Sequence, residues 1–301
     1  MTEPTSHTIP RIKAKPDDDN LVHRTLLQDI FLRFLHHRVG MIGASIILLL
    51  IILAIFGSSL APYEPNEMDF VNPPFSPPTL QHPFGTDDFG RDILSRIMVG
   101  ARVSVMVGIV SVSLAASVGT ILGMIAGYGS RLWDEIIMRS MDVLLAFPTI
   151  LLALAVMAIL GKGVNNAMVA IGIVYIPIFA RIARSSVLSV KTEEFVLAAR
   201  ALGAGDLHIL VRHIFPNILS PIIVETSLSL SFAILAEAAL SFFGLGTQPP
   251  DPSWGSMLSF GRQWVREAPW FSFFPGLAIF VTVLSFNLVG DGWRDALDPR
   301  L

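Results

Sequence analysis

The chain has 301 residues, of which 52% are hydrophobic and only 15% are charged, and its mean hydropathy is +0.63. Soluble domains carry about 25% charged residues, so this composition excludes an ordinary soluble protein and predicts an all-α, multi-pass membrane protein. The formal net charge of -3 is too small to suggest a nucleic-acid partner, and the absence of cysteine excludes thiol catalysis, disulfides and iron–sulfur ligation.

Residues 1–38 precede the first long apolar run and are mostly polar, which does not fit a cleavable signal peptide. Near the end of this segment, apolar residues with i, i+4 spacing stand beside basic ones. They are Leu26, Leu27, Ile30, Phe31, Phe34 and Leu35. We therefore expect a cytoplasmic N-terminal segment whose interfacial amphipathic helix leads into the first membrane span and contacts lipid.

A helix needs about 20 apolar residues to cross the hydrocarbon core of a bilayer. Six runs are near this length, at residues 39–61, 103–127, 141–160, 164–185, 218–243 and 271–289. We expect six transmembrane helices, with an external loop and helix in residues 62–102 and a core domain in residues 103–301. A short polar hinge at residues 130–139 is expected before the third span.

The positive-inside rule orients these spans. With the N-terminus in the cytoplasm, 15 Lys and Arg residues fall on cytoplasmic segments and 6 on external ones. We therefore expect both termini in the cytoplasm.

The external segment contains oppositely charged residues four positions apart. We expect Thr86 to cap a helix over residues 87–100, with exposed ion pairs Asp87–Arg91 and Asp92–Arg96. Its membrane-facing stripe is expected to be Ile93, Leu94, Ile97 and Met98. The candidate residues of this segment are Thr86, Asp87, Asp88, Arg91, Asp92 and Arg96.

The segment 188–216, between the fourth and fifth spans, has the pattern of two short helices joined by a glycine turn. We expect Thr192 to cap the first helix and Gly203 to end it in the left-handed conformation. The second helix, residues 207–213, is expected to end at Pro216. The alternative is an ordinary interfacial re-entry loop. The candidate residues are Glu194, Ala198, Ala199, Arg200, Gly203, Ala204, Asp206 and Pro216.

The motifs of the common catalytic and nucleotide sites are missing. Of the four lysines only Lys191 precedes a threonine, and no glycine run leads into it, so the sequence predicts no phosphate-binding loop. No H-E-x-x-H or G-x-S-x-G motif is found, so we expect no catalytic residue, no metal site and no cofactor bound by this chain.

The fifth span contains two carboxylates, Glu225 and Glu237, which lie about 120° apart around a helix. We expect each to face a polar cavity or a helix partner rather than to form one proton relay. Both remain candidate pathway residues, and the length of this span also allows Glu225 to lie near the cytoplasmic surface.

The stretch Leu197-Ala198-Ala199-Arg200-Ala201-Leu202-Gly203, followed by His213-Ile214-Phe215-Pro216, resembles the E-A-A-x-x-x-G-x9-I-x-L-P loop of bacterial ABC importer permeases. Leu197, His213 and Phe215 depart from that pattern, and a Leu-Ala-Ala start is familiar in the peptide branch. Other stretches are similar to the second permease subunit of dipeptide, oligopeptide and nickel importers. They are residues 82–92, 248–250 with 254–255, and 286–292 before 294–299.

This resemblance implies a type I ABC importer permease fold in the bacterial inner membrane. It implies four kinds of partner: a homologous second permease, two cytoplasmic ATPases that bind ATP and Mg²⁺, an external solute-binding protein, and lipid. Residues 188–216 would be the loop that couples to one ATPase. The external segment would stabilise an outer gate helix, which we favour, or dock the binding protein.

The solute implied by the resemblance is a di- or oligopeptide. The same machine could import nickel, glutathione or an opine-like solute. A secondary transporter acting alone is the alternative from another class.

Overall fold

The computed structural model describes residues 32–69 and 73–297, and these residues form helices and loops with no strand. The long elements are α2 (Arg38–Leu60), α3 (Ile93–Tyr128), α6 (Val164–Val190), α9 (Phe215–Phe242) and α11 (Trp270–Leu297). The shorter ones are α4 (Arg131–Leu145), α5 (Thr149–Leu160), α7 (Glu194–Ala201), α8 (Asp206–Ile209) and α10 (Trp254–Gly261), with a π-helix at Leu210–Ile214 and a 3-10 helix at Arg262–Trp264.

The expected N-terminal amphipathic helix falls largely outside the described residues. Within them, residues 32–36 are helical, and the ring of Phe34 is buried and stacks on Trp293 of α11 with centroids 4.6 Å apart. The last turn of this segment is therefore fixed to the C-terminal helix.

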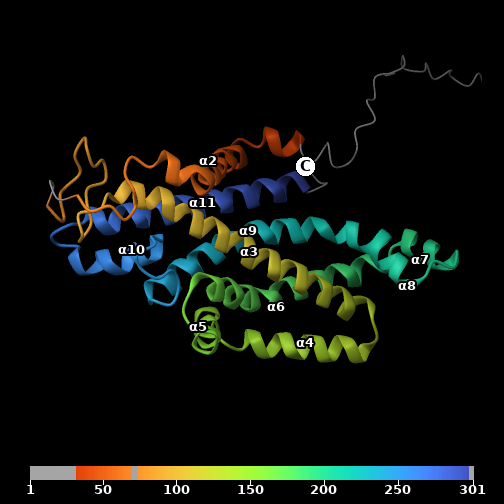
Figure 1. Ribbon diagram of the computed structural model, residues 1–301. Helices are drawn as coiled ribbons and strands as arrows, with labels where there is room; N and C mark the ends of the chain where they lie inside the picture. Colours follow the sequence, from red (N-terminus) through yellow and green to blue (C-terminus); the bar gives the residue numbers. More distant parts are fainter. Residues whose placement is uncertain (1–31, 70–72, 298–301) are drawn as a thin grey trace, which may run out of the picture.

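The long helices run side by side along one axis (Figure 1). Five stretches are long and apolar enough to cross a membrane: α2, α3, α6, the continuous helix Asp206–Phe242, and α11. They become six if α4 and α5 together make one span. Five of the six expected spans are therefore recovered as continuous helices, and α3 begins ten residues earlier than the second apolar run.

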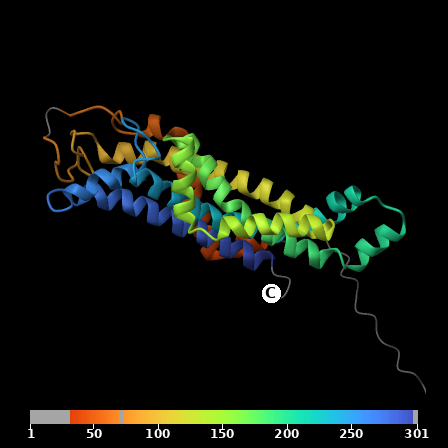
Figure 2. The same cartoon turned by 90° about the horizontal axis from the view of Figure 1, so that it is seen from below.

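The third expected span, residues 141–160, is not straight. α4 and α5 meet at an angle of 95°, and α5 turns across the bundle (Figure 2). The break falls at Phe147 and Pro148, because a residue before proline is driven out of the helical conformation. The expected polar hinge at residues 130–139 is itself helical and forms most of α4.

Helices α3 and α6 pack closely against each other in the interior of the molecule. Gly119, Gly123 and Gly127 recur every fourth residue on α3, and a Cβ atom added to any of them would lie under 3.0 Å from an atom of α6. Small residues at this spacing let two helix backbones approach. The sequence of α3 therefore fixes α6 directly against it.

The loops gather at the two ends of this bundle. α7 and α8 lie at one end, and α10 lies at the other together with the loop that precedes α3 (Figure 1). We call the two regions the 188–216 loop and the 62–92 loop.

Candidate functional site

The 188–216 loop begins where α6 ends at Val190. In its first helix, α7, Glu193 rather than the expected Thr192 occupies the N-cap position, without a capping bond from its side chain. The Thr192 hydroxyl instead donates to the Ser189 carbonyl at 2.8 Å. Gly203 follows α7 with φ = +85°, as expected for a left-handed turn.

The expected second helix does not end at Pro216. α8 passes through the π-helix into α9, and together they form the continuous helix Asp206–Phe242. Pro216 lies in the first turn of α9. The wider π-helical turn just before it accommodates the missing N–H, so the proline does not break the chain of helical hydrogen bonds.

One side of the 188–216 loop is attached to the bundle. The Tyr128 hydroxyl, at the last residue of α3, donates to Asp206 at 2.6 Å and accepts from Arg200 at 3.1 Å. Val196 and Ile209 are fully buried. These contacts fix α7 and α8 to the end of α3.

The other side of the same loop exposes large apolar side chains. Leu202 is 88% exposed and Leu207 76% exposed, and Phe195 and Leu197 are also exposed. Ala198 is exposed, whereas Ala199 is half-buried and packs on the main core. An apolar surface of this kind marks a protein or membrane contact.

In the 62–92 loop, several charged side chains are buried instead. Asp87 is completely buried, its carboxylate lies 2.7 Å from Arg91 Nε and 3.6 Å from Arg96 Nε, and it accepts the backbone N–H groups of Phe89 and Arg91. The Asp87–Arg91 pair is therefore present, but it closes a turn rather than a helix and it is not exposed. Burial and the adjacent charge of Asp87 raise the pKa of Asp88 above its ordinary value.

The helix expected over residues 87–100 begins only at Ile93. Gly90 has φ = +76°, which interrupts helical geometry, and Asp92 caps α3 by accepting the Ser95 N–H at 2.7 Å. Thr86 caps nothing. Its hydroxyl accepts the Ser76 N–H at 2.9 Å.

The expected pair Asp92–Arg96 is not formed. Asp92 lies 2.9 Å from Nδ1 of His82, which is 2% exposed, and Arg96 donates to Pro65 O at 2.7 Å and Asn66 Oδ1 at 3.0 Å. The expected membrane-facing stripe is also wrong, because Ile93 and Ile97 are buried in a core cluster.

His82 connects two parts of the 62–92 loop, at Asp69 and at Asp92. Its Nε2 lies 3.1 Å from Asp69 and its Nδ1 contacts Asp92. Burial lowers the pKa of His82, but the hydrogen bonds and charges of Asp92 and Asp69 outweigh burial, so the pKa lies above its ordinary value. The two carboxylates therefore stabilise the imidazolium of His82 relative to that of a free histidine.

The two carboxylates of α9 have partners within the chain. Glu237 is 1% exposed and accepts hydrogen bonds from Ser241 at 2.7 Å and from Ser104 of α3 at 3.4 Å. Glu225 is half-buried and accepts from Ser229 at 3.0 Å. A polar cavity or a partner on another helix was expected for each carboxylate, and Glu237 has such a partner in Ser104 of α3.

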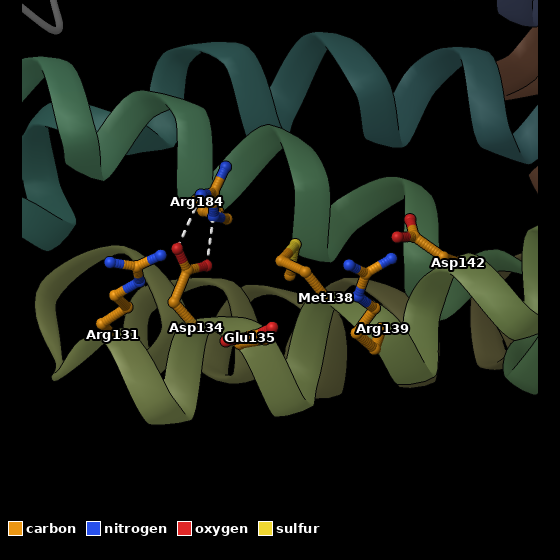
Figure 3. Close-up of a pocket in the computed structure, with 7 residues that line it drawn as sticks. All are labelled: Arg131, Asp134, Glu135, Met138, Arg139, Asp142 and Arg184. Carbon is orange, nitrogen blue, oxygen red and sulfur yellow. Dashed lines mark hydrogen bonds and ion pairs between the residues drawn. The ribbon is translucent and has the colours of Figure 1, made fainter.

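A polar cavity lies between α4 and α6 (Figure 3). Arg184 of α6 makes a two-bond ion pair with Asp134 of α4, with distances of 2.5 and 2.7 Å, and Arg181 pairs with Asp142 at 2.6 Å. Sequence reasoning missed this site, because it treated residues 130–139 as a hinge. The signal that would have found it is the helical spacing of the charges from Arg131 to Asp142. Within residues 32–69 and 73–297, no group of His, Asp and Glu side chains is arranged to hold a metal ion.

A bundle of apolar helices that are long enough to cross a bilayer is the architecture of a multi-pass membrane protein. Residues 119–301 match the family described as the inner membrane component of binding-protein-dependent transport systems. Residues 25–78 match the N-terminal transmembrane domain of oligopeptide transport permease C. The chain belongs to this family of ABC importer permeases and is a multi-pass inner-membrane protein.

Two curated relatives span nearly the whole chain. The chain is 46% identical over 292 residues to a dipeptide transport system permease protein of Alkalihalophilus pseudofirmus, covering 97% of this chain and 96% of the relative. It is 47% identical over 289 residues to a glutathione transport system permease protein of Escherichia coli, covering 96% and 94%.

A solved structure shows the same fold. The inward-facing MetNI methionine ABC transporter matches with a TM-score of 0.56 and 15% sequence identity, covering 66% of this chain and 95% of the matched chain. The type I importer permease fold expected from the sequence is confirmed.

Proposed function

We propose that this chain forms half of the translocation pathway of an ATP-driven importer of di- and oligopeptides. The observation that carries the proposal is the near full-length similarity to a dipeptide permease, together with the N-terminal match to an oligopeptide permease domain. A homologous second permease supplies the other half of the pathway, and a solute-binding protein delivers the peptide.

Glutathione is the second candidate solute, because an equally similar relative is a glutathione permease. Glutathione is itself a small peptide with free carboxylates, so the two candidates share their chemistry. No comparable observation favours the other two candidates, nickel and opine-like solutes.

We further propose that the 188–216 loop couples this chain to one of two ATPases, which bind ATP and Mg²⁺. The exposed side chains of Leu202 and Leu207 fit an apolar groove on a partner, and the contacts of Tyr128 support the loop from behind. The chain itself then hydrolyses no ATP. Saturable ATP binding by the purified subunit would contradict this proposal.

For this arrangement the 188–216 loop and both termini lie in the cytoplasm and the 62–92 loop lies outside, as the 15 to 6 division of basic residues favours. A protease-sensitive tag inserted after Leu80, whose side chain is fully exposed, should be cleaved in intact spheroplasts. A tag after Leu301 should be protected. The opposite pattern would overturn the orientation.

The solute is tested with the complete complex in proteoliposomes supplied with its binding protein. Labelled dipeptide, glutathione and nickel are offered separately, and ATP-dependent uptake is measured. Dipeptide uptake is the expected result, and glutathione uptake alone would select the second candidate. Uptake of nickel alone would overturn the peptide proposal.

A further inference from the structure

All five charged residues of α4 lie on one face of the helix. Arg131, Asp134, Glu135, Met138, Arg139 and Asp142 follow the spacing i, i+3, i+4, i+7, i+8, i+11, which places them on one side of a helix. With Arg184 of α6 they line a cavity of about 250 Å³ (Figure 3). We call this surface the α4 charged face.

Only some of these charges are neutralised. Asp134 pairs with Arg184, and Asp142 pairs with Arg181. Among the described residues, no ion pair involves the other three charged residues of the face. They are Arg131, Glu135 and Arg139. The cavity therefore presents two guanidinium groups and one carboxylate that are available to a ligand.

The opposite side of α4 is apolar, which leaves protein or water as the surroundings of the charged face. Its apolar side chains Trp133, Ile136 and Val143 are at least half exposed, at 56%, 50% and 61%. Such a surface suits contact with lipid or with an apolar neighbour. Charged groups next to a membrane span avoid hydrocarbon and face protein or a water-filled cavity. α4 begins three residues after α3 ends at Tyr128, so the start of the α4 charged face lies near the end of the molecule that carries α7 and α8 (Figure 1).

We propose that the α4 charged face is a weak release site that binds the free carboxylate of the transported peptide on its way to the cytoplasm. Arginine recognises a carboxylate with two parallel hydrogen bonds, and Glu135 is placed to accept the ammonium group of the same solute. Because exposed charge pairs are weak, the solute is held loosely, as release into the cytoplasm requires. This inference rests on the proposed function and names the solute chemistry that the pathway recognises.

The test uses the complete complex in phosphatidylcholine nanodiscs without nucleotide or binding protein. Weak binding of alanylalanine is followed by saturation-transfer NMR, with alanylalanine amide as the ligand that lacks the carboxylate. We expect the signal of alanylalanine to fall about tenfold in the double variant Arg131→Gln, Arg139→Gln, in line with the loss of charge-assisted hydrogen bonds. Arg139→Lys should retain most of the signal, and the amide should give little signal even with the wild type.

A matched control is Arg102→Gln, which removes an exposed arginine of α3 from outside the cavity. In proteoliposomes the double variant should import about tenfold less alanylalanine per ATP hydrolysed, while ATP hydrolysis stimulated by the loaded binding protein and recovery of the second permease stay within about twofold of wild type. The control should behave as wild type in both assays.

Several results would overturn the inference. They are an unchanged signal in the double variant, a parallel loss of uptake and ATP hydrolysis, loss of the second permease on purification, and an effect that appears only with phosphatidylglycerol. The last two would make the face a subunit contact or a lipid site. If the wild type imports no peptide at all, the proposed function fails. If it imports peptide and the double variant binds and transports equally well, only the release site fails.

Discussion

The two loop regions of this molecule use polar residues in opposite ways. In the 62–92 loop three charged or titratable groups are inside: Asp87 is fully buried, Asp92 and His82 are each 2% exposed, and all three are held by side chains of the same loop and α3. In the 188–216 loop the charges are exposed, and so is Leu202, at 88%. The buried charges of the first region have partners within the chain, whereas the second region packs on the bundle on one side and exposes large apolar side chains on the other.

The largest effect should come from breaking the buried pair of the 62–92 loop. Asp87→Asn leaves Arg91 and Arg96 without their carboxylate, and loss of one partner from a buried pair costs about 3–5 kcal/mol. Thermal unfolding of the purified protein in detergent should show a large loss of stability. Glu64→Gln, an exposed carboxylate of the same loop, is the control and should be neutral. Equal stability of both variants would mean that the 62–92 loop is not held by its charges.

The opposite result is expected for the 188–216 loop. Leu202→Asp changes a side chain that touches little of its own chain, so thermal stability should remain within about 0.5 kcal/mol of wild type. Association with the ATPase should weaken by about 2 kcal/mol or more, the cost of losing a central apolar contact. The amount of ATPase that co-purifies with the wild type and with Leu202→Asp measures this weakening. Normal ATPase recovery would show that this surface does not bind it.

A substitution at the glycine turn of the same loop changes the backbone conformation without changing a side-chain contact. Gly203 has φ = +85° and a Cβ atom there would meet nothing within 4 Å, so Gly203→Val strains only the backbone, at a cost of about 1–3 kcal/mol. Transport should fall while membrane insertion stays normal. Gly205→Ala is the matched control, because Gly205 has φ = -69° and equally open surroundings. Similar transport by both variants would argue against a required left-handed turn.

The smallest effect concerns pH and the 62–92 loop. The folded-state pKa of His82 is raised, so its contribution to stability is present in full below about pH 6.5 and is lost as the pH rises through the raised value. The stability difference between wild type and His82→Gln should therefore shrink as the pH rises above about 6.5. Thermal unfolding of both proteins across that range measures it. A difference that stays constant with pH would show that His82 is not charged in the fold.

The sequence predicted the long apolar helices well, because hydrophobicity over 20 residues reports burial or lipid contact directly. It also predicted the left-handed Gly203, since few other residues end a helix that way. Where helices start was harder to predict. The spacing of Asp87 and Arg91 suits an i, i+4 helical pair equally well, and only the tertiary contacts of Asp92 and the conformation of Gly90 show that the helix begins later.

The charged cavity was missed for a different reason. Residues 130–139 were interpreted by composition as a hinge, although their charges already had helical spacing. The contact between α4 and α6 depends on Arg181 and Arg184, which are about 40 to 50 residues away in sequence. Such pairs depend on how α4 packs against a distant helix, which the local pattern of α4 does not describe.

Helix α3 contacts both the 62–92 loop and the 188–216 loop. It is capped by Asp92 in the 62–92 loop, and its last residue, Tyr128, bonds Asp206 and Arg200 of the 188–216 loop. At 1.5 Å per residue its 36 residues span about 54 Å, so this one helix is long enough to connect the two faces of a membrane. If the ATPase proposed for the 188–216 loop binds beside Tyr128, thermodynamic linkage makes the effect reciprocal. The factor by which its binding changes an affinity at the Asp92 end is the factor by which that second binding changes the affinity for the ATPase.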